Sequence, residues 1–98
     1  MRYNAMIKNF ICAETQAIWN GTVSRRLAVE VQKIVRRKLR FLDAAASPAD
    51  LRSPPGNWLE ALKGDRKGCY SIRVNDQWRI CFRFEHGNAC DVELVDYH

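Results

Sequence analysis

The sequence predicts one α+β domain, in which two N-terminal helices pack on one face of a twisted, mainly antiparallel sheet of four or five strands. Three observations indicate this class. Apolar residues recur at helical spacing over residues 24–45, apolar and polar residues alternate over residues 69–84, and the helical segments precede most of the strands. A chain of 98 residues is long enough for one hydrophobic core, so we expect a single domain over residues 1–98.

The first half of the chain carries the helical signals. Residues 7–11 alternate enough for a first strand, and residues 12–20 are a predicted short helix that Gly21 ends, because glycine is favoured just beyond a helix terminus. Ser24 is the predicted N-cap of the main helix, residues 24–45. One apolar stripe of this helix is expected to lie on the sheet, and its members are Leu27, Val31, Ile34, Val35, Leu39 and Leu42.

The second half of the chain predicts a meander of strands. Residues 58–62 form a short strand, and after a glycine-containing turn residues 69–74 and 78–84 form an alternating pair. A three-residue loop joins this pair and places Arg73 opposite Arg79. A two-residue loop is rejected because it would mix the polar and apolar faces.

The last strand is predicted at residues 90–96. A five-residue loop before it keeps the apolar face uniform, and the resulting pairs are Phe84 with Cys90, Phe82 with Val92, and Ile80 with Leu94. In this register Tyr97 comes out on the same side as Arg79, one step farther along. We therefore expect the arginine pair and the C-terminus to meet.

Arg73 and Arg79 are the first candidates for a functional site. Their Cβ atoms are expected roughly 4.5–5.5 Å apart on one open face, where two like charges repel. A guanidinium group matches the oxygens of a phosphate, so this pair suits an anionic ligand. The simpler alternative is two solvated arginines on a wet face.

Composition restricts the partners. The formal net charge of +5 points to an anionic partner, either a nucleic acid, an acidic protein or a membrane surface. No apolar run is long enough to span a membrane, and no signal peptide is visible. The four cysteines lack metal-ligand spacing and are expected to be buried free thiols in a reducing cytoplasm, so we predict neither a metal nor another cofactor.

Five segments carry a resemblance to a known family. They are LRSPPGN at residues 51–57, LKGDR at 62–66, YSIRV at 70–74, NDQWRI at 75–80 and VDYH at 95–98. With these segments in this order, the chain resembles the HigB toxins, or plasmid-maintenance killer proteins, of the RelE/ParE superfamily. The resemblance begins at Met6, which is therefore a second candidate for the native first residue.

This resemblance implies a RelE-like fold and a function in a type II toxin–antitoxin system. Such toxins are small cytoplasmic endoribonucleases that cut mRNA in the A site of the translating ribosome, next to ribosomal RNA. The implied partner is a HigA-like helix-turn-helix antitoxin, which holds the toxin inactive. Operator DNA is then contacted only through the antitoxin complex.

Cleavage of RNA without a metal needs a base for the 2′-hydroxyl, cations for the phosphate, and an acid for the leaving 5′-oxygen. The resemblance assigns phosphate or acid–base roles to Lys63, Arg79, Asp96, Tyr97 and His98. His98 suits proton transfer because an unperturbed histidine has a pKa near ~6.5. Glu60 stands where some relatives carry histidine, and it is either the general base or an ion-pair partner of Lys63 or Arg66.

Other basic and aromatic residues are candidates for RNA binding. Arg66, Lys67 and Arg73 lie around the predicted site. A second stripe of the main helix is either a solvated face or a contact with structured RNA, and it consists of Lys33, Arg36, Arg37 and Arg40. Trp58 can stack on a base, but we expect it to pack.

Two other functions compete with mRNA cleavage. A ParE-like toxin of the same fold would poison DNA gyrase by binding, and it has no need of Glu60, Tyr97 and His98 around an arginine. A non-catalytic RNA-binding module would prefer exposed aromatic residues on its sheet face, whereas the predicted open face carries mostly arginine, serine and cysteine.

Overall fold

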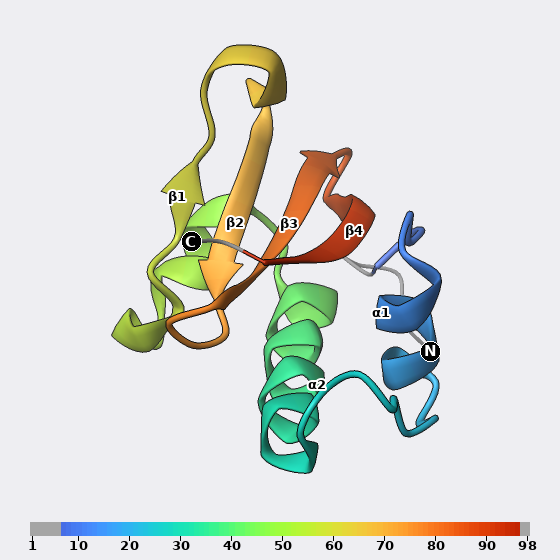
Figure 1. Cartoon of the computed structure of the whole chain (residues 1–98). Coiled ribbons are helices and arrows are strands. Elements are labelled where there is room, and N and C mark those ends of the chain that lie inside the picture. The colour runs from blue at the N-terminus through green and yellow to red at the C-terminus, as the bar shows by residue number, and fades with distance from the viewer. Residues whose placement is uncertain (1–6, 97–98) are drawn as a thin grey trace.

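A computed structural model describes residues 7–96; Met6, Tyr97 and His98 therefore lie outside the described residues. Two α-helices, α1 (Ala13–Trp19) and α2 (Val29–Ala44), precede a four-stranded sheet (Figure 1). The strands are β1 (Glu60–Ala61), β2 (Cys69–Arg73), β3 (Trp78–Glu85) and β4 (Asn88–Asp96), and every neighbouring pair is antiparallel in the order β1-β2-β3-β4. Three short 3-10 turns connect these elements, η1 (Pro48–Arg52), η2 (Pro55–Asn57) and η3 (Gly64–Arg66). The predicted α+β class is confirmed.

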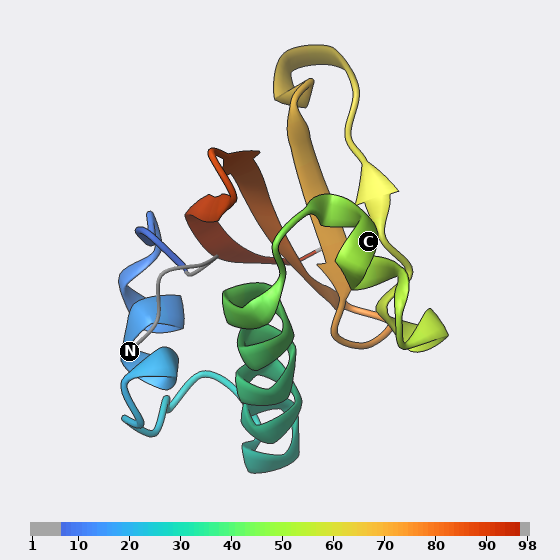
Figure 2. The same cartoon turned by 180° about the vertical axis from the view of Figure 1, so that it is seen from behind.

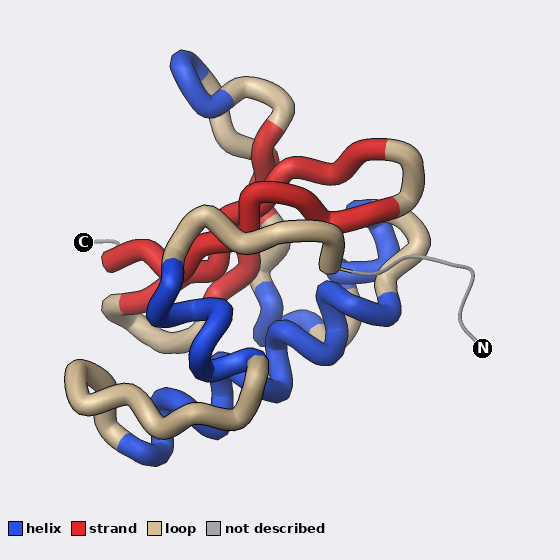
Figure 3. Tube along the Cα trace, turned by 90° about the vertical axis from the view of Figure 1, so that its right-hand side faces the viewer, coloured by secondary structure: helices blue, strands red, loops and turns tan. Residues whose placement is uncertain are grey.

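Both α-helices lie on one side of the sheet (Figure 3). The apolar stripe of α2 faces inward, with Val35, Leu39 and Leu42 each fully buried, while Val31 and Ile34 are partly buried against the same core. The sheet contributes its apolar face to this core through Ile72, Val74, Ile80, Phe82 and Val92. The predicted contact between the main helix and the sheet is therefore confirmed.

The main helix begins later than predicted. Its first residue is Val29 and its N-cap is Ala28, so the prediction that Ser24 caps it is wrong. The side chain of Gln32 explains the difference. It accepts a hydrogen bond from the Ser24 N–H at 2.8 Å and donates to the carbonyl oxygens of Ser24 and Leu27 at 2.9 and 2.7 Å. These bonds hold residues 24–27 as a loop on the N-terminal turn of α2.

The expected first strand is only partly formed. Ile7 and Phe10 make two isolated parallel bridges, to Ala89 and Val92 of β4, rather than a continuous strand. Backbone hydrogen bonds of 2.7–3.1 Å join this segment to β4, among them Lys8 N–H to the Ala89 oxygen. The segment thereby covers the outer edge of β4, which would otherwise present unpaired backbone groups.

The register between β2 and β3 is the predicted one. Ile72 lies opposite Ile80 and Arg73 opposite Arg79, and the Val74 N–H donates to the Trp78 oxygen at 2.9 Å. The three-residue loop is stabilised by Asn75, whose side-chain oxygen accepts hydrogen bonds from the backbone N–H groups of Gln77 and Trp78. Arg73 and Arg79 therefore share one face of the sheet.

The register between β3 and β4 is only partly as predicted. Ile80 pairs with Leu94, but Phe84 pairs with Ala89 rather than Cys90, and the register shifts between Cys81 and Arg83. The predicted five-residue loop is wrong because His86 and Gly87, both at positive φ, make a two-residue turn. A bulge at Asp91, also at positive φ, then adds one residue to β4, so Phe82 does not pair with Val92 but the apolar face is restored.

Candidate active site

The face of the sheet that lies away from the helices is polar. It includes two adjacent cross-strand rows, one of Glu60, Ser71, Cys81 and Glu93 and the other of Arg73, Arg79 and Val95. We call these seven residues the polar face. All four strands contribute to it, and β1 brings Glu60 to the edge of β2.

Arg79 lies at the centre of the polar face and is buried, with 8% of its surface exposed. Its Nε donates a hydrogen bond to the Ser71 hydroxyl at 2.8 Å, and its Nη2 donates to the carbonyl oxygens of Trp58 at 2.5 Å and Ser71 at 3.3 Å. The acceptors come from β2 and from the segment before β1, so two parts of the chain fix the guanidinium. Arg79 lies on the predicted face of the sheet, but the expectation that its side chain is open to solvent there is wrong, because only 8% of its surface is exposed.

Glu60 lies beside the Arg79 guanidinium. Its Oε1 is 3.5 Å from Arg79 Nη2, and 57% of its side chain is exposed. The pairing of Glu60 with Ser71 across β1 and β2 holds the carboxylate at this position. Glu60 does form an ion pair, but its partner is Arg79 and not Lys63 or Arg66, the partners considered from the sequence. The exposure also leaves the carboxylate accessible to a substrate hydroxyl, as a general base requires.

Arg73 has an ion-pair partner of its own. Its guanidinium forms an ion pair with Asp76, which lies in the following loop, and this places a separate carboxylate beside each arginine. The repulsion expected from the cross-strand pair is therefore offset within the chain. Arg73 keeps about a third of its side chain exposed, so it remains accessible at the rim of the polar face.

The loop between β1 and β2 carries three of the predicted basic residues. Lys63 and Lys67 flank η3 and are exposed. Arg66 Nη2 lies 3.9 Å from Glu93 Oε2, so Arg66 reaches the far end of the row that begins at Glu60. Because both side chains are partly exposed, this ion pair contributes little to stability and leaves Arg66 available to another anion.

Of the three C-terminal candidates, only Asp96 lies within the described residues. Asp96 pairs across with Trp78, while Val95 pairs with Arg79, so strand alternation sets Asp96 on the face opposite Arg79. Its carboxylate accepts a hydrogen bond from Gln77 Nε2 at 3.2 Å. Tyr97 and His98 lie outside the described residues, and their proximity to Arg79 stays a prediction.

The basic stripe of α2 is not uniform. Lys33, Arg37 and Arg40 are exposed, as a solvated or RNA-binding surface requires. Arg36 is different, because its Nε donates to the Ile18 carbonyl oxygen at 3.1 Å and so joins α1 to α2. The stripe lies on α2, away from the polar face.

Sequence reasoning missed one buried polar pair. Lys38 Nζ donates a hydrogen bond to Asn57 Oδ1 at 2.5 Å, and the two residues are 5% and 0% exposed. Asn57 in turn donates to the carbonyl oxygens of Leu51 and Ser53 at 3.2 Å, which ties η1 and η2 to α2. Burial is the main cause that lowers the pKa of Lys38. The pair fixes the segment immediately before Trp58.

Trp58 does not pack, contrary to expectation. It is 67% exposed and follows η2, and its carbonyl oxygen is the one that holds Arg79. Asn57, its neighbour, is the anchored residue. It ends η2, which belongs to the green-to-yellow connection before β1 (Figure 2). Trp58 is therefore exposed enough to stack on a base, which is the alternative role considered from the sequence.

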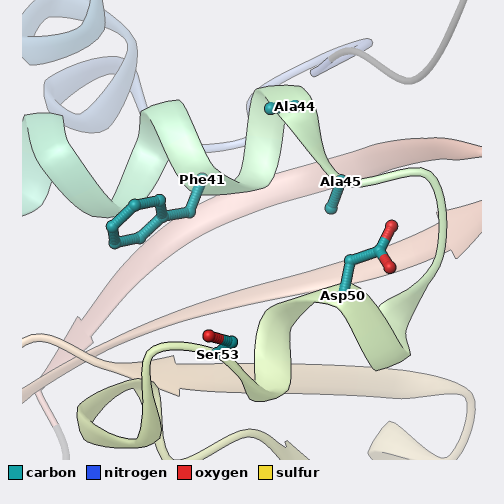
Figure 4. A pocket seen from close by; sticks show the side chains of 5 residues that line it. All are labelled: Phe41, Ala44, Ala45, Asp50 and Ser53. Atoms are coloured by element: carbon teal, nitrogen blue, oxygen red, sulfur yellow. The ribbon is translucent and has the colours of Figure 1, made fainter.

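A separate cavity lies between the C-terminal end of α2 and η1. It has a volume of about 240 Å³ and is lined by Phe41, Ala44, Ala45, Asp50 and Ser53 (Figure 4). The Asp50 carboxylate at its rim accepts a hydrogen bond from the Ala46 N–H at 2.9 Å. None of these residues belongs to the polar face.

The remaining polar groups offer little further chemistry. Among residues 7–96, no three His, Cys, Asp or Glu side chains are grouped so that they could hold a metal ion. The cysteines are all free, but Cys12 and Cys69 are only partly buried, unlike Cys81 and Cys90. Burial raises the pKa of the Cys81 thiol. Within the same range, no helix is both long and apolar enough to cross a membrane.

Comparison with known proteins decides the family. Residues 16–98 match the family described as RelE-like toxin of type II toxin-antitoxin system HigB. This chain belongs to the HigB-like toxins. A Vibrio cholerae relative named Toxin HigB-1 is 44% identical over 70 residues, which cover 71% of this toxin and 74% of the relative. A Proteus vulgaris relative named Endoribonuclease HigB is 31% identical over 93 residues, which cover 95% of this toxin and 100% of the relative.

Solved structures support the RelE-like fold. The toxin is similar to a chain of the YoeB-YefM complex from Staphylococcus aureus, with a TM-score of 0.56 and 16% identity over 100% of this toxin and 99% of that chain. It is also similar to the YoeB/ParE toxin from Agrobacterium tumefaciens, with a TM-score of 0.58 and 14% identity over 98% and 100% of the two chains. The predicted RelE-like fold is thus confirmed. Membership in a type II toxin–antitoxin family also means that an antitoxin is the partner of this toxin.

Proposed function

We propose that this toxin is a metal-independent endoribonuclease that cuts mRNA in the A site of the translating ribosome. One observation carries the proposal: Glu60 places an exposed carboxylate 3.5 Å from the buried, multiply hydrogen-bonded guanidinium of Arg79. The name of the Proteus vulgaris relative, an endoribonuclease, supports the same activity.

The proposed reaction is a transfer of the phosphate from the 5′-oxygen to the 2′-oxygen. Glu60 takes the proton of the 2′-hydroxyl as this oxygen attacks phosphorus. Arg79 and Lys63 stabilise the charge that develops on the phosphate oxygens. The 5′-oxygen leaves with a proton from His98 or Tyr97. Asp96 lies on the face opposite Arg79, so its proposed role is to orient these two residues rather than to contact the phosphate. The products carry a 2′,3′-cyclic phosphate and a 5′-hydroxyl.

The basic residues around this centre are proposed to hold the RNA. Arg66, Lys67 and Arg73 neutralise phosphates of the mRNA on either side of the cut. The exposed members of the α2 stripe contact ribosomal RNA, where neutralised phosphates supply affinity without reading sequence. Because Arg36 is engaged with the Ile18 carbonyl, it contributes less to this contact than Lys33, Arg37 and Arg40.

We further propose that the antitoxin is a HigA-like helix-turn-helix protein, and that the toxin meets operator DNA only through the complex with it. The exposed, basic residues of the toxin are available to an acidic partner as well as to RNA. Translating ribosomes are cytoplasmic, so the proposed activity places the toxin in the cytoplasm.

The test compares three substrates under one set of conditions. The purified toxin is incubated with naked RNA, with ribosomes carrying mRNA, and with gyrase and supercoiled DNA. We expect cuts in the ribosome-bound mRNA, mapped by primer extension, and normal gyrase activity. Gyrase inhibition without RNA cleavage would instead establish the ParE-like function, and RNA binding without cleavage would establish a non-catalytic module.

A further inference from the structure

Trp58 is an exposed aromatic residue whose position the packing of the protein does not explain. It exposes 67% of its surface, whereas Trp19 and Trp78 are partly buried against the core. Tryptophan is highly buried on average in folded proteins, because its ring carries a large apolar area. An indole left in water beside a candidate active site therefore suggests a ligand.

The backbone of Trp58 is also unusual. Its φ of 45° and ψ of 59° lie in the left-handed region, which bulky residues rarely adopt. Hydrogen bonds hold this conformation from both sides, since the Trp58 N–H donates to the Pro55 oxygen at 3.1 Å and the Trp58 oxygen accepts from Arg79. The contact with Arg79 explains the backbone. It does not explain the tryptophan, because glycine or asparagine adopts the same backbone at lower cost.

We propose that the indole of Trp58 stacks on a nucleobase next to the scissile phosphate and helps to select the site of cleavage. This inference rests on the proposed endoribonuclease function. The Trp58 oxygen lies 2.5 Å from Arg79 Nη2, so the side chain of Trp58 begins within a few ångströms of the guanidinium proposed to bind the phosphate. The proposed stacked base therefore belongs to the nucleotide that carries this phosphate or to its immediate neighbour.

A nucleobase fits this position better than an apolar protein side chain. Single-stranded RNA is recognised by stacking its unpaired bases on aromatic side chains, and every base offers a π-face to such a platform. The Trp58 carbonyl oxygen accepts a hydrogen bond from the charged Arg79, and Arg79 in turn forms an ion pair with Glu60. A base brings its own phosphate to these charges, whereas an apolar side chain would bring nothing that pairs with them.

The test measures single-turnover cleavage of ribosome-bound mRNA by Trp58→Phe and Trp58→Asn. Phenylalanine keeps an aromatic face, while asparagine tolerates the left-handed backbone and so preserves the fold without a ring. Loss of one stacked base is expected to lower kcat/KM roughly 5- to 150-fold in the asparagine variant and less in the phenylalanine variant. Val23→Ala, at a residue that is 68% exposed and outside the site, is the control and should cleave like wild type.

An mRNA with one abasic nucleotide beside the cut identifies the stacked base. At the correct position, the abasic change and Trp58→Asn should each lower the rate, but together they should cost little more than either alone. Wild-type rates from Trp58→Asn would overturn the inference while leaving the proposed function intact. A loss of antitoxin affinity without any loss of cleavage would also overturn it, because Trp58 would then be an antitoxin contact.

A binding measurement separates failure of the inference from failure of the proposed function. Trp19→Phe and Trp78→Phe together leave Trp58 as the only tryptophan, and its fluorescence is followed during titration with a short single-stranded RNA. Quenching supports stacking even if the wild type cuts no RNA. No quenching in a protein that also cuts no RNA would overturn both proposals.

Discussion

Replacing Arg79 with alanine is expected to destabilise the fold as well as to inactivate the site. The guanidinium is the donor for the Ser71 hydroxyl, the Ser71 carbonyl and the Trp58 carbonyl, and Ser71 is fully buried. A buried acceptor left without its donor costs about 1–3 kcal/mol, so leaving the two buried Ser71 oxygens without theirs predicts a loss of about 2–6 kcal/mol. The ion pair with Glu60 adds little, because the carboxylate is 57% exposed.

This loss is large for a domain of this size. It is a substantial part of the roughly 5–15 kcal/mol that stabilises most domains, and it lowers the melting temperature by about 10–50 °C. Thermal unfolding of Arg79→Ala is compared with that of Arg83→Ala. The side chain of Arg83 is 42% exposed and pairs with Glu85 at 2.9 Å and with Asp91 at 3.1 Å. The Arg83→Ala variant should melt within a few degrees of wild type. Equal melting temperatures for the two variants would refute the structural role of Arg79.

Three further predictions concern a buried charge, the C-terminus and the α2 stripe. Burial lowers the pKa of Lys38 below 10.5, so between that lowered pKa and 10.5 the unfolded chain binds more protons. In wild type, the free energy of unfolding should therefore rise with pH across this window, and in Lys38→Met it should rise less steeply. Urea titrations at several pH values measure this slope, and equal slopes for the two proteins would contradict the prediction. Deleting Tyr97 and His98 should abolish mRNA cleavage in a translating extract; undiminished cleavage, read beside a melting curve, would remove the tail from the site. Replacing both Arg37 and Arg40 with glutamine should weaken ribosome binding and reduce its salt slope by roughly one unit for each phosphate that is no longer neutralised; an unchanged slope would mark the stripe as a solvated face.

The parts of the fold that follow from residue periodicity were predictable from sequence. The β2–β3 register depends on the length of one loop. Ile72 and Ile80 alternate with Arg73 and Arg79, so only a three-residue loop keeps apolar residues opposite apolar ones. The β3–β4 register was harder because two departures compensate. The short turn at His86 shifts the strands by one residue, and the bulge at Asp91 shifts them back, so a longer loop gives the same pairing for Ile80.

The sequence indicated Glu60 and Arg79 as candidates, but it did not indicate their contact or the burial of Arg79. Glu60 and Arg79 were both candidates, yet their contact depends on β1 pairing with β2, and β1 is only two residues long. The burial of Arg79 follows from the Trp58 carbonyl, a backbone group that no side-chain pattern reveals. Burial of Lys38 was likewise unpredictable, because its partner Asn57 lies 19 residues away in an irregular segment.

The most direct test of the account is the rate at which Glu60→Gln cleaves ribosome-bound mRNA in a single turnover. This change keeps the shape of the side chain and removes its basicity. The matched control is Glu85→Gln, at a carboxylate that is 47% exposed and paired with Arg83 outside the proposed site. Loss of a general base predicts a rate at least ~10²-fold below wild type for Glu60→Gln, with Glu85→Gln unchanged. A near-normal rate for Glu60→Gln would contradict the account and transfer the role of base to Lys63 or a C-terminal residue.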